Sequence, residues 1–553
     1  MADLSPGTER ADGPARPEAG AEARPGASRR SRLAAAWPAL LVVAATVAAH
    51  GVGIANGFVW DDQTIVVENP ATRDPSRIGQ VLLSPDDTPP YYRPLNRASY
   101  LLDYQLFGMD PRGFHAVGLV LHAASALALY ALARRLFASR PPALLAALLL
   151  AVHPVHVEAV AFVSASNNLL ALLFALGSLT LLIDAAARRS LSRAALSGLA
   201  FLLALLSKEQ GAMVLSVLVA WLYLPGLPGR AAGPARWRLL VPHAIAAVLY
   251  AVLRTVSLGA PVASAPILPG LPGRLALDAW VLPRYLGLAL FPHDLAVFHE
   301  APVSLRSVAW IPLAWVAIAV SLVALLRRPT VASIVGLLWF ASNLLPIANI
   351  VPIPSTVLAE RFFHASAAGL WVVLADVAWR ATARIPRTVA IAAAAAALFG
   401  LGARTAARTR DWHDDAALFR SAVRAEPGSV LAHFNLGVAL KDEGDLDGAR
   451  EEWLRALAIK PDDAGTHAQL GTLAAVRGDY VEAEAHYRGA LAADPSLAEA
   501  QLNLGRICER TGRPEEALAR YRAVLEGRPP ADPALATRAR EGIARLSSRA
   551  PVR

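Results

Sequence analysis

The sequence contains only one cysteine, Cys508, among its 553 residues. A single cysteine excludes an intrachain disulfide, a CxxC metal site and a relay of thiols. Charged residues are also scarce: they make up 18% of the chain, whereas 55% of the residues are hydrophobic and the mean hydropathy is +0.40. These values exclude an ordinary soluble enzyme and predict a multi-pass membrane protein, with enough length left for a second, soluble domain.

Positive charge is in excess, but its arrangement does not indicate a nucleic-acid partner. The formal net charge is +9. The arginines gather in short clusters beside apolar runs, such as Arg134 with Arg135 and Arg327 with Arg328. Clusters of this kind orient a chain in a bilayer, with the positive side in the cytoplasm. We therefore expect a lipid bilayer, and no nucleic acid, as the partner of this half of the chain.

The order of composition along the chain predicts a tail followed by a membrane domain. Residues 1–32 are rich in Pro, Gly, Ala and Arg without apolar periodicity, which is typical of a disordered tail, here cytoplasmic. Segment 33–405 contains about twelve apolar runs long enough to be candidate spans. The first run, 33–54, is longer than a signal-peptide core, so we interpret it as an uncleaved anchor.

The arginine clusters require an even number of crossings between neighbouring clusters, and this fixes the expected topology. One run, 275–292, breaks the parity and contains Asp278, Pro283 and Arg284. We expect it to lie on the outer surface or to re-enter, because charges and proline are poorly tolerated in a lipid-exposed span. About eleven full spans then remain. The N-terminus is expected in the cytoplasm and the C-terminal region outside.

Unusual polar residues lie almost entirely in the segments that join spans on the expected outer side. The long first loop, 55–113, contains "NGFVWDDQTIVVENP", with the adjacent Asp61 and Asp62, and "YYRPLNR". Later outer segments read "HPVHVEA", "SKEQG" and "VLAERFFH". Ionisable groups at membrane depth are costly unless they line a cavity or pair with one another. Their shared side favours a functional site.

Each stretch also has a purely structural interpretation. Asp61 and Asp62 alone are typical of turn residues at a membrane interface, and Arg361 can extend its charged end toward water from within the bilayer. His153 and His156 have a spacing seen in metal ligands, but the sequence offers no third ligand. The individual signals are weak, and their common location carries the functional hypothesis.

A 34-residue repeat marks the C-terminal part of the chain. Five sets of residues recur at this step: Pro427, Pro461, Pro495 and Pro529; Gly437, Gly471 and Gly505; Ala449, Ala483 and Ala517; Trp453, Tyr487 and Tyr521; Leu436, Leu470 and Leu504. This is the period of tetratricopeptide (TPR) repeats, in which small residues stand where paired helices cross closely and proline ends each second helix.

The repeat period sets the expected domain boundaries. Three TPR repeats occupy 430–531, a lone helix precedes them at 411–429, and a capping helix and tail follow at 532–553. Between 430 and 528 there are 12 Lys and Arg against 17 Asp and Glu, a net charge of −5. The repeats are therefore not expected to bind nucleic acid.

The order of these stretches resembles a known family over residues 33–545. The polar stretches quoted above, followed by TPR repeats, are similar to those of the transmembrane and TPR-containing O-mannosyltransferases and their bacterial relatives. The resemblance implies an all-α fold: a polytopic membrane domain of the GT-C glycosyltransferase class and a TPR α-solenoid. One departure is that a charged triplet often found after the His-Pro motif is replaced here by Ser166, Asn167 and Asn168.

The same resemblance implies a function and a location. Members of this class take a sugar from a polyprenyl-phosphate carrier and attach it on the exoplasmic side of a membrane. For this chain the implied reaction moves a mannose-like sugar to Ser or Thr hydroxyls of a protein. The implied location is a bacterial inner membrane, with the TPR domain on the periplasmic side.

Glycosyl transfer to a hydroxyl requires a base that takes the acceptor proton. We assign this role to Asp61 or Asp62, which correspond to the acidic pair of the family's first outer loop. The second carboxylate would orient the acceptor or stabilise the base. Glu158 would orient the acceptor or a neighbouring histidine.

The departing phosphate requires positive or hydrogen-bonding groups. Arg93 and Arg361 are the main candidates, because guanidinium groups match phosphate oxygens, and Lys208 and His153 are further candidates. A monophosphate leaving group does not require a divalent ion. We therefore predict no essential metal and no cofactor.

The TPR repeats are expected to form a groove that presents an acceptor polypeptide. The candidate peptide-binding residues, polar positions on the first helices of the repeats, are Asn435, His467, Gln469 and Asn503. Two other classes of function remain open: an inert membrane-anchored TPR scaffold, and a transporter or flippase for a lipid-linked sugar. The transporter would require charges near the middle of the spans, whereas the charges here lie at span ends.

Overall fold

The computed structural model describes residues 29–84, 91–224, 234–259, 271–299, 309–347, 358–527 and 532–549. These residues form helices joined by turns and contain no strand, so the predicted all-α class is confirmed for the described part of the chain. Most of the predicted tail, residues 1–28, lies outside the described residues. The first helix begins at Arg29, a few positions before the apolar run itself.

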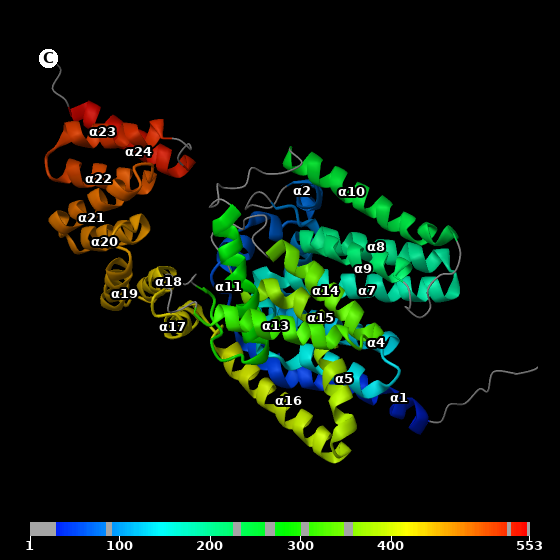
Figure 1. The fold of residues 1–553 in the computed structure, drawn as a ribbon. Coiled ribbons are helices and arrows are strands. Elements are labelled where there is room, and N and C mark those ends of the chain that lie inside the picture. Colours follow the sequence, from blue (N-terminus) through cyan, green and yellow to red (C-terminus); the bar gives the residue numbers. More distant parts are fainter. Residues whose placement is uncertain are drawn as a thin grey trace, which may run out of the picture.

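A helical bundle forms the N-terminal two thirds of the chain (Figure 1). Its long helices, and the short helices of the connecting segments, are α1 (Arg29–His50), α2 (Ile78–Leu83), α3 (Pro94–Phe107), α4 (Pro111–Leu136), α5 (Arg140–Val152), α6 (Val157–Ala161), α7 (Ser166–Arg188), α8 (Leu191–Ser207), α9 (Val214–Tyr223), α10 (Val241–Leu258), α11 (Leu271–Leu290), α13 (Ile311–Leu326), α14 (Val331–Leu344), α15 (Glu360–Ala381) and α16 (Arg387–Arg410).

Fewer helices than expected are long enough to cross a bilayer. Six segments of the described chain qualify by length and composition: Ala36–Ala55, Pro111–Leu136, Val163–Arg188, Arg236–Leu258, Glu360–Arg384 and Arg387–Arg410. A seventh is reached if Arg140–Val152 and Pro154–Ala161, which meet at an angle of 52°, count as one span. The prediction of about eleven spans is therefore not confirmed.

The reason is that several predicted runs form short helices. Four apolar helices have 10–17 residues: Leu191–Ser207, Glu209–Tyr223, Ile311–Leu326 and Val331–Ile347. A helix needs about 20 residues to span a bilayer. The polar segments that interrupt these runs, above all the one around Lys208, end the helices early and bring polar side chains to the helix ends.

Helix α11 corresponds to the run that was expected to lie on the surface or re-enter. It is one continuous helix with Pro283 inside it. In Figure 1 it runs across the end of the bundle rather than along it. It packs against α13, and the Trp315 indole N–H donates a hydrogen bond of 2.9 Å to the Ala279 carbonyl. Helix α11 has 20 residues but is not among the segments that qualify as spans.

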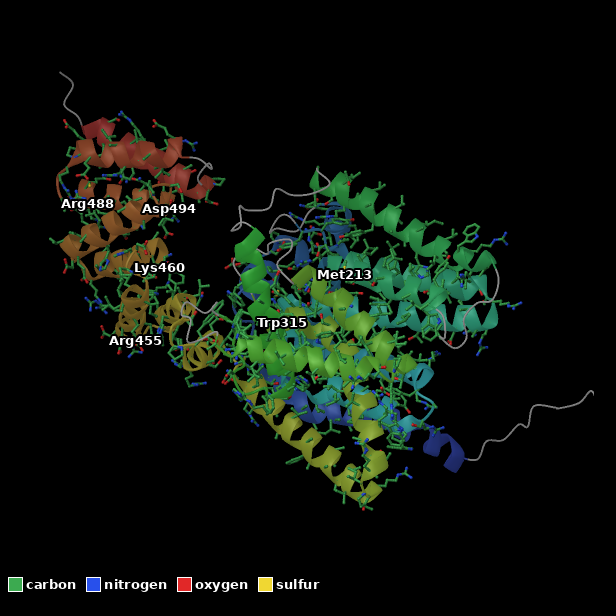
Figure 2. All side chains as sticks on the ribbon, in the orientation of Figure 1. Met213, Trp315, Arg455, Lys460, Arg488 and Asp494 are labelled. Atoms are coloured by element: carbon green, nitrogen blue, oxygen red, sulfur yellow. The ribbon has the colours of Figure 1, made fainter. Side chains whose placement is uncertain are left out.

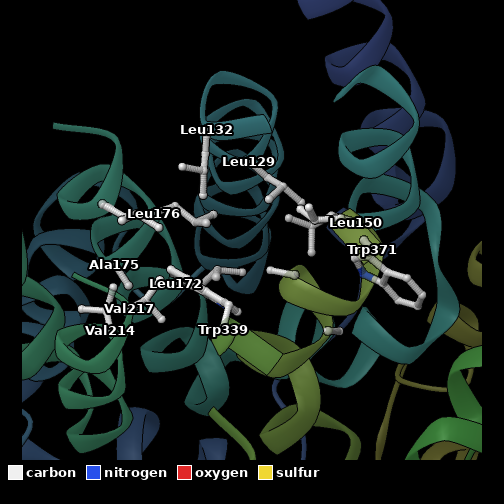
Figure 3. Packing of buried hydrophobic residues seen from close by; sticks show 14 of the residues in the cluster. Leu129, Leu132, Leu150, Leu172, Ala175, Leu176, Val214, Val217, Trp339 and Trp371 are labelled. Carbon is white, nitrogen blue, oxygen red and sulfur yellow. The ribbon is translucent and has the colours of Figure 1, made fainter. Parts of the chain in front are cut away.

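The bundle core is close-packed and apolar. Figure 3 shows Leu132 of α4, Leu172 and Leu176 of α7 and Trp339 of α14 meeting in one buried cluster. Helices α14 and α15 cross at glycines: a Cβ added at Gly336 would lie 2.8 Å from the Gly369 carbonyl oxygen. Such small-residue crossings let membrane helices approach closely.

The C-terminal helices form the TPR solenoid, which extends away from the bundle (Figure 1). They are α17 (Asp415–Ala425), α18 (Val430–Asp442), α19 (Leu446–Ile459), α20 (Ala464–Arg477), α21 (Tyr480–Ala493), α22 (Ala498–Arg510), α23 (Pro514–Glu526) and α24 (Pro533–Arg549). The recurring glycine has the role predicted for it: a Cβ at Gly437 would lie 2.6 Å from Cδ1 of Trp453, and one at Gly471 would lie 2.9 Å from the Tyr487 ring.

Candidate functional site

The polar segments predicted to share one face do meet in the fold. Hydrogen bonds or ion pairs link the first outer loop to the segment after the His-Pro motif, that segment to the start of α15, and the loop to the segment around Lys208. Residues more than 100 positions apart in the sequence therefore surround one region at the end of the bundle.

The two adjacent carboxylates have different environments. Asp62 is fully buried. Its Oδ1 accepts hydrogen bonds from the backbone N–H and the hydroxyl of Ser164, at 2.7 and 2.6 Å, and its Oδ2 accepts one from the Val59 N–H at 3.2 Å. Burial raises the pKa of the Asp62 carboxyl to about 7, although the hydrogen bonds from Ser164 and Val59 oppose this shift. Asp62 therefore ties the first loop to the bundle.

Asp61, in contrast, has an exposed side chain. Partial burial raises the pKa of its carboxyl, and the nearby positive charge of Arg361 counteracts the shift. A carboxylate that is accessible, partly desolvated and close to a fixed cation has the properties of a general base. Of the two residues predicted for this role, the structure leaves Asp61 available.

Arg361 is held in place by an ion pair and by aromatic rings. Its guanidinium group pairs with Glu158, whose other oxygen accepts the Arg361 backbone N–H at 2.9 Å. The guanidinium carbon lies 5.6 Å from the ring centre of Trp60 and 4.9 Å from that of Phe362. Glu158, predicted to orient the acceptor or a histidine, pairs with Arg361, whose side chain retains 15% exposure.

Two further basic side chains lie in this region. Lys208 is buried and donates a hydrogen bond to the Asn168 side-chain oxygen, while Arg93 forms a 3.1 Å ion pair with Glu209. Burial, and then the positive charges of Arg93 and Arg361, lower the pKa of the Lys208 ammonium group well below its usual value. An anion bound here would relieve that repulsion.

The Ser166–Asn168 triplet, where the family often has charges, supplies amides in this chain. Asn168 accepts the Lys208 hydrogen bond, and its own Nδ2 donates to the Ala165 carbonyl at 2.8 Å. Ser166 donates to the Asn96 side-chain oxygen at 2.9 Å. In place of charged residues, this chain therefore has neutral side chains that bind Lys208 and Asn96.

His153 is not brought to the cations. Its Nδ1 accepts a hydrogen bond from the Val155 N–H at 3.2 Å, so its Nε2 carries the proton and donates to the Ala289 carbonyl at 3.0 Å. Both ring nitrogens are therefore used in connecting the turn after α5 to α11. In the described part of the chain, no group of three or more His, Cys, Asp or Glu residues is placed to hold a metal ion.

A polar pocket lies beside the cations. Its cavity volume is about 60 Å³. Its lining combines Arg93 and Arg97 with amide and hydroxyl side chains, and consists of Ile65, Asn69, Ala71, Thr72, Val81, Arg93, Asn96, Arg97, Tyr100, Ser164 and Asn167. Through Ser164 the pocket adjoins Asp62, and through Arg93 it adjoins the ion pair next to Lys208.

The predicted peptide-binding residues of the repeats divide into two groups. Asn435, Gln469 and Asn503 are half-buried and recur at the 34-residue step. His467 has a structural position: its ring contacts the Pro461 carbonyl at 3.0 Å and His486 at 3.0 Å. One repeat earlier, the equivalent residue His433 contacts the Pro427 carbonyl in the same way. This position therefore connects a helix to the proline-containing loop before it.

Sequence reasoning missed the residues that act as partners in the site. Ser164 is the main anchor of Asp62, and Asp415, near the start of α17, accepts a hydrogen bond of 2.7 Å from the Trp60 backbone N–H. Neither carries a motif of its own. The only signal for Ser164 was its place just before the unusual triplet, and there was none for a contact between positions 60 and 415.

These features define a class of protein: a helical membrane bundle followed by a TPR solenoid. At one end of the bundle, an exposed carboxylate and several basic side chains lie next to a polar pocket. A family model for dolichyl-phosphate-mannose-protein mannosyltransferases matches residues 96–257, and a tetratricopeptide repeat model matches 401–464 and 469–533.

Two relatives with assigned names match most of this chain. Protein O-mannosyl-transferase F38B6.6 of Caenorhabditis elegans is 24% identical over 449 residues, covering 76% of this chain and 62% of that protein. Protein O-mannosyl-transferase TMTC1 of Homo sapiens is 27% identical over 515 residues, covering 80% of this chain and 57% of that protein. The predicted resemblance to the transmembrane and TPR-containing O-mannosyltransferases is confirmed, and the chain spans about three fifths of the length of these two relatives.

Among solved structures, the chain is similar to an archaeal oligosaccharyltransferase from Archaeoglobus fulgidus in complex with an inhibitory peptide and a dolichol-phosphate. The TM-score is 0.38 at 15% identity, covering 71% of this chain and 56% of that chain. This similarity is too distant to bear on the site.

Proposed function

We propose that this chain is a membrane glycosyltransferase that moves a sugar, mannose or a similar hexose, from a polyprenyl-phosphate donor to Ser or Thr hydroxyls of a protein. The observation that carries the proposal is the exposed Asp61 carboxylate beside Arg361, with Lys208 and Arg93 close by. The similarity to named protein O-mannosyltransferases supports the same reaction.

The proposed reaction uses the Asp61 carboxylate and the basic side chains near it. The acceptor hydroxyl oxygen forms a bond to C1 of the sugar while the bond from C1 to the phosphate oxygen breaks, and the electron pair leaves with the phosphate. Asp61 takes the hydroxyl proton. Arg361 stabilises the negative charge that develops on the phosphate, with Lys208 and Arg93 nearby, and Glu158 fixes the direction of the Arg361 guanidinium.

We assign the pocket beside Arg93 to the sugar of the donor. Asn69, Asn96 and Asn167 line it, and their amides both donate and accept hydrogen bonds, as a polyhydroxylated ring requires. The lipid chain of the donor would lie along the apolar bundle. Asp62 holds Ser164, one of the residues that line this pocket, and we do not assign it as the base.

The TPR solenoid is proposed to present the acceptor polypeptide. Asn435, Gln469 and Asn503 form a ladder of half-buried amides at equal steps, which suits an extended peptide backbone. This role requires the site and the repeats to lie on one side of a bacterial inner membrane, the outer side. A reporter fused after Arg410 should accordingly appear on the side opposite to one fused at Ala187.

The test is a transfer assay with the full chain in lipid nanodiscs, using radiolabelled mannosyl-phosphoryl-polyprenol and a Ser/Thr-rich protein. Transfer should appear with the wild type and fall by about 10² to 10⁴ in Asp61→Asn, as expected for loss of a general base. Glu68→Gln is the control, because Glu68 is an exposed carboxylate of the same loop. Wild-type binding of partners through the repeats without any sugar transfer would favour the inert scaffold instead.

A further inference from the structure

Trp60, the residue before Asp61, has an unusual backbone conformation. Its φ is +53°, and among the described residues only one other non-glycine residue, Arg189, has a positive φ. A residue with a side chain rarely adopts this left-handed conformation, and it persists only where surrounding contacts impose it. The consequence is local: the chain turns at Trp60 so that Asp62 points into the protein while Asp61 stays exposed.

Several contacts hold this turn, and two of them come from α17, the helix that precedes the repeats. The Trp60 backbone N–H donates a hydrogen bond of 2.7 Å to Oδ1 of Asp415. The indole ring stacks on Phe162 with centroids 5.4 Å apart, and its edge packs near Phe419 of α17 at 6.4 Å. The Gly57 N–H donates to the His413 carbonyl at 2.9 Å.

Helix α17 is itself fixed to the bundle and does not depend on the repeats alone. Arg408, buried at the end of α16, contacts the Ser421 hydroxyl at 2.9 Å and Asp411 at 3.1 Å. The hydrophobic cluster around Trp412 and Phe419 also contains residues from the first loop and from the His-Pro segment. The first loop therefore rests on a helix that lies about 355 positions further along the chain.

We propose that Asp415 is a positioning residue for the base Asp61, and that α17 belongs to the catalytic unit as well as to the solenoid. By accepting the Trp60 N–H, Asp415 holds the left-handed turn that keeps Asp61 exposed next to Arg361. This inference rests on the proposed function for its effect on rate, but the clamp itself is a structural claim that can be measured without activity.

Asp415→Ala tests the clamp, and α17 offers a matched control. Asp414, the preceding residue, caps the same helix by accepting the Ala417 N–H at 2.7 Å but does not contact Trp60. Asp414→Ala should therefore disturb the start of α17 without releasing the loop. Asp415→Asn keeps an amide oxygen that can accept the Trp60 N–H, so it should restore what Asp415→Ala loses.

Two readouts separate this inference from the proposed function. In hydrogen exchange of the full chain, the peptide covering residues 56–66 should take up deuterium faster in Asp415→Ala than in the wild type, Asp414→Ala or Asp415→Asn. In the transfer assay, kcat should fall by about 10²-fold in Asp415→Ala at unchanged KM for the donor, as misplacement of a reacting group would cause.

Unchanged exchange in Asp415→Ala would overturn the clamp. Faster exchange with a wild-type kcat would overturn the positioning role, as would an equal loss of kcat in Asp414→Ala. If the wild type transfers no sugar, the proposed function fails, and the exchange experiment still decides whether Asp415 holds the loop.

Discussion

The TPR repeats and the membrane bundle encode their contacts in different ways. In the repeats, a residue and its partner recur every 34 positions, so that Gly437 under Trp453 is repeated as Gly471 under Tyr487. Figure 2 shows the repeats carrying charged side chains such as Arg455, Arg488 and Asp494. In the bundle, the contacts that build the site join single residues far apart, as between Asp62 and Ser164. Contacts that recur with a sequence period can therefore be predicted from the sequence. Contacts that occur once, between distant residues, cannot.

Among the variants that compare the bundle site with the repeats, loss of Arg361 should cause the largest fall in sugar transfer. Arg361→Gln should reduce transfer by about 10² to 10³, the effect of removing one group that stabilises developing charge. It also leaves the buried Glu158 without its ion pair. Arg77→Gln is the control, because Arg77 lies exposed in the first loop and, within the described residues, forms its ion pair with Asp74. Transfer that survives in Arg361→Gln would show that the site does not depend on this cation.

Removal of the repeats should separate presentation from chemistry. Deleting residues 430–545 leaves α17 and the first-loop contacts in place. Transfer to a protein acceptor should fall on the order of 10²-fold, comparable to the gain from holding a substrate beside its site. Transfer to a short Ser/Thr peptide should persist, and unchanged modification of proteins by a stable truncated chain would refute the presentation role.

The pH dependence of transfer should report on Asp61. A base acts when it is ionised, so the rate should rise with pH through the pKa of Asp61, and burial places that pKa above the ordinary carboxyl value. The Arg361 charge lowers the same pKa, so the residual activity of Arg361→Gln should have its acidic limb at higher pH than the wild type. The limb in Arg77→Gln should not move, and a shift to lower pH in Arg361→Gln would contradict the assignment of the base.

A small change in the repeats should have the smallest effect on chemistry. A methyl group at Gly437 collides with the Trp453 ring, so Gly437→Ala should destabilise the solenoid by about 1–3 kcal/mol. Gly428→Ala is the control, because a Cβ there meets no atom within 4 Å. In limited proteolysis of the full chain, Gly437→Ala should be cleaved faster in the repeats, whereas Gly428→Ala should not. The rate of sugar transfer to a short peptide should be unchanged in both variants.

The sequence allowed the solenoid to be predicted in detail and the site only in outline. Repeat phase located Gly437 and Trp453 because their contact recurs. The polar stretches indicated which segments meet, but not that Asp62 would be buried against Ser164, 102 positions away, while Asp61 stays exposed. His153 had a suggestive spacing, yet its ring is used to hold a turn. The prediction of about eleven spans is not confirmed, because hydropathy does not show where a polar segment such as that around Lys208 ends a helix early.

The division of labour between the two adjacent carboxylates is the central claim, and one paired measurement tests it most directly. Asp61→Asn and Asp62→Asn are compared for sugar transfer per folded molecule and for thermal unfolding in the same nanodiscs. Asp61→Asn should lose transfer by about 10² or more at a wild-type melting temperature. Asp62→Asn should lose about 1–3 kcal/mol of stability, because an amide cannot accept all the hydrogen bonds that its carboxylate receives. Full transfer by Asp61→Asn, together with loss of transfer by a stable Asp62→Asn, would contradict the account.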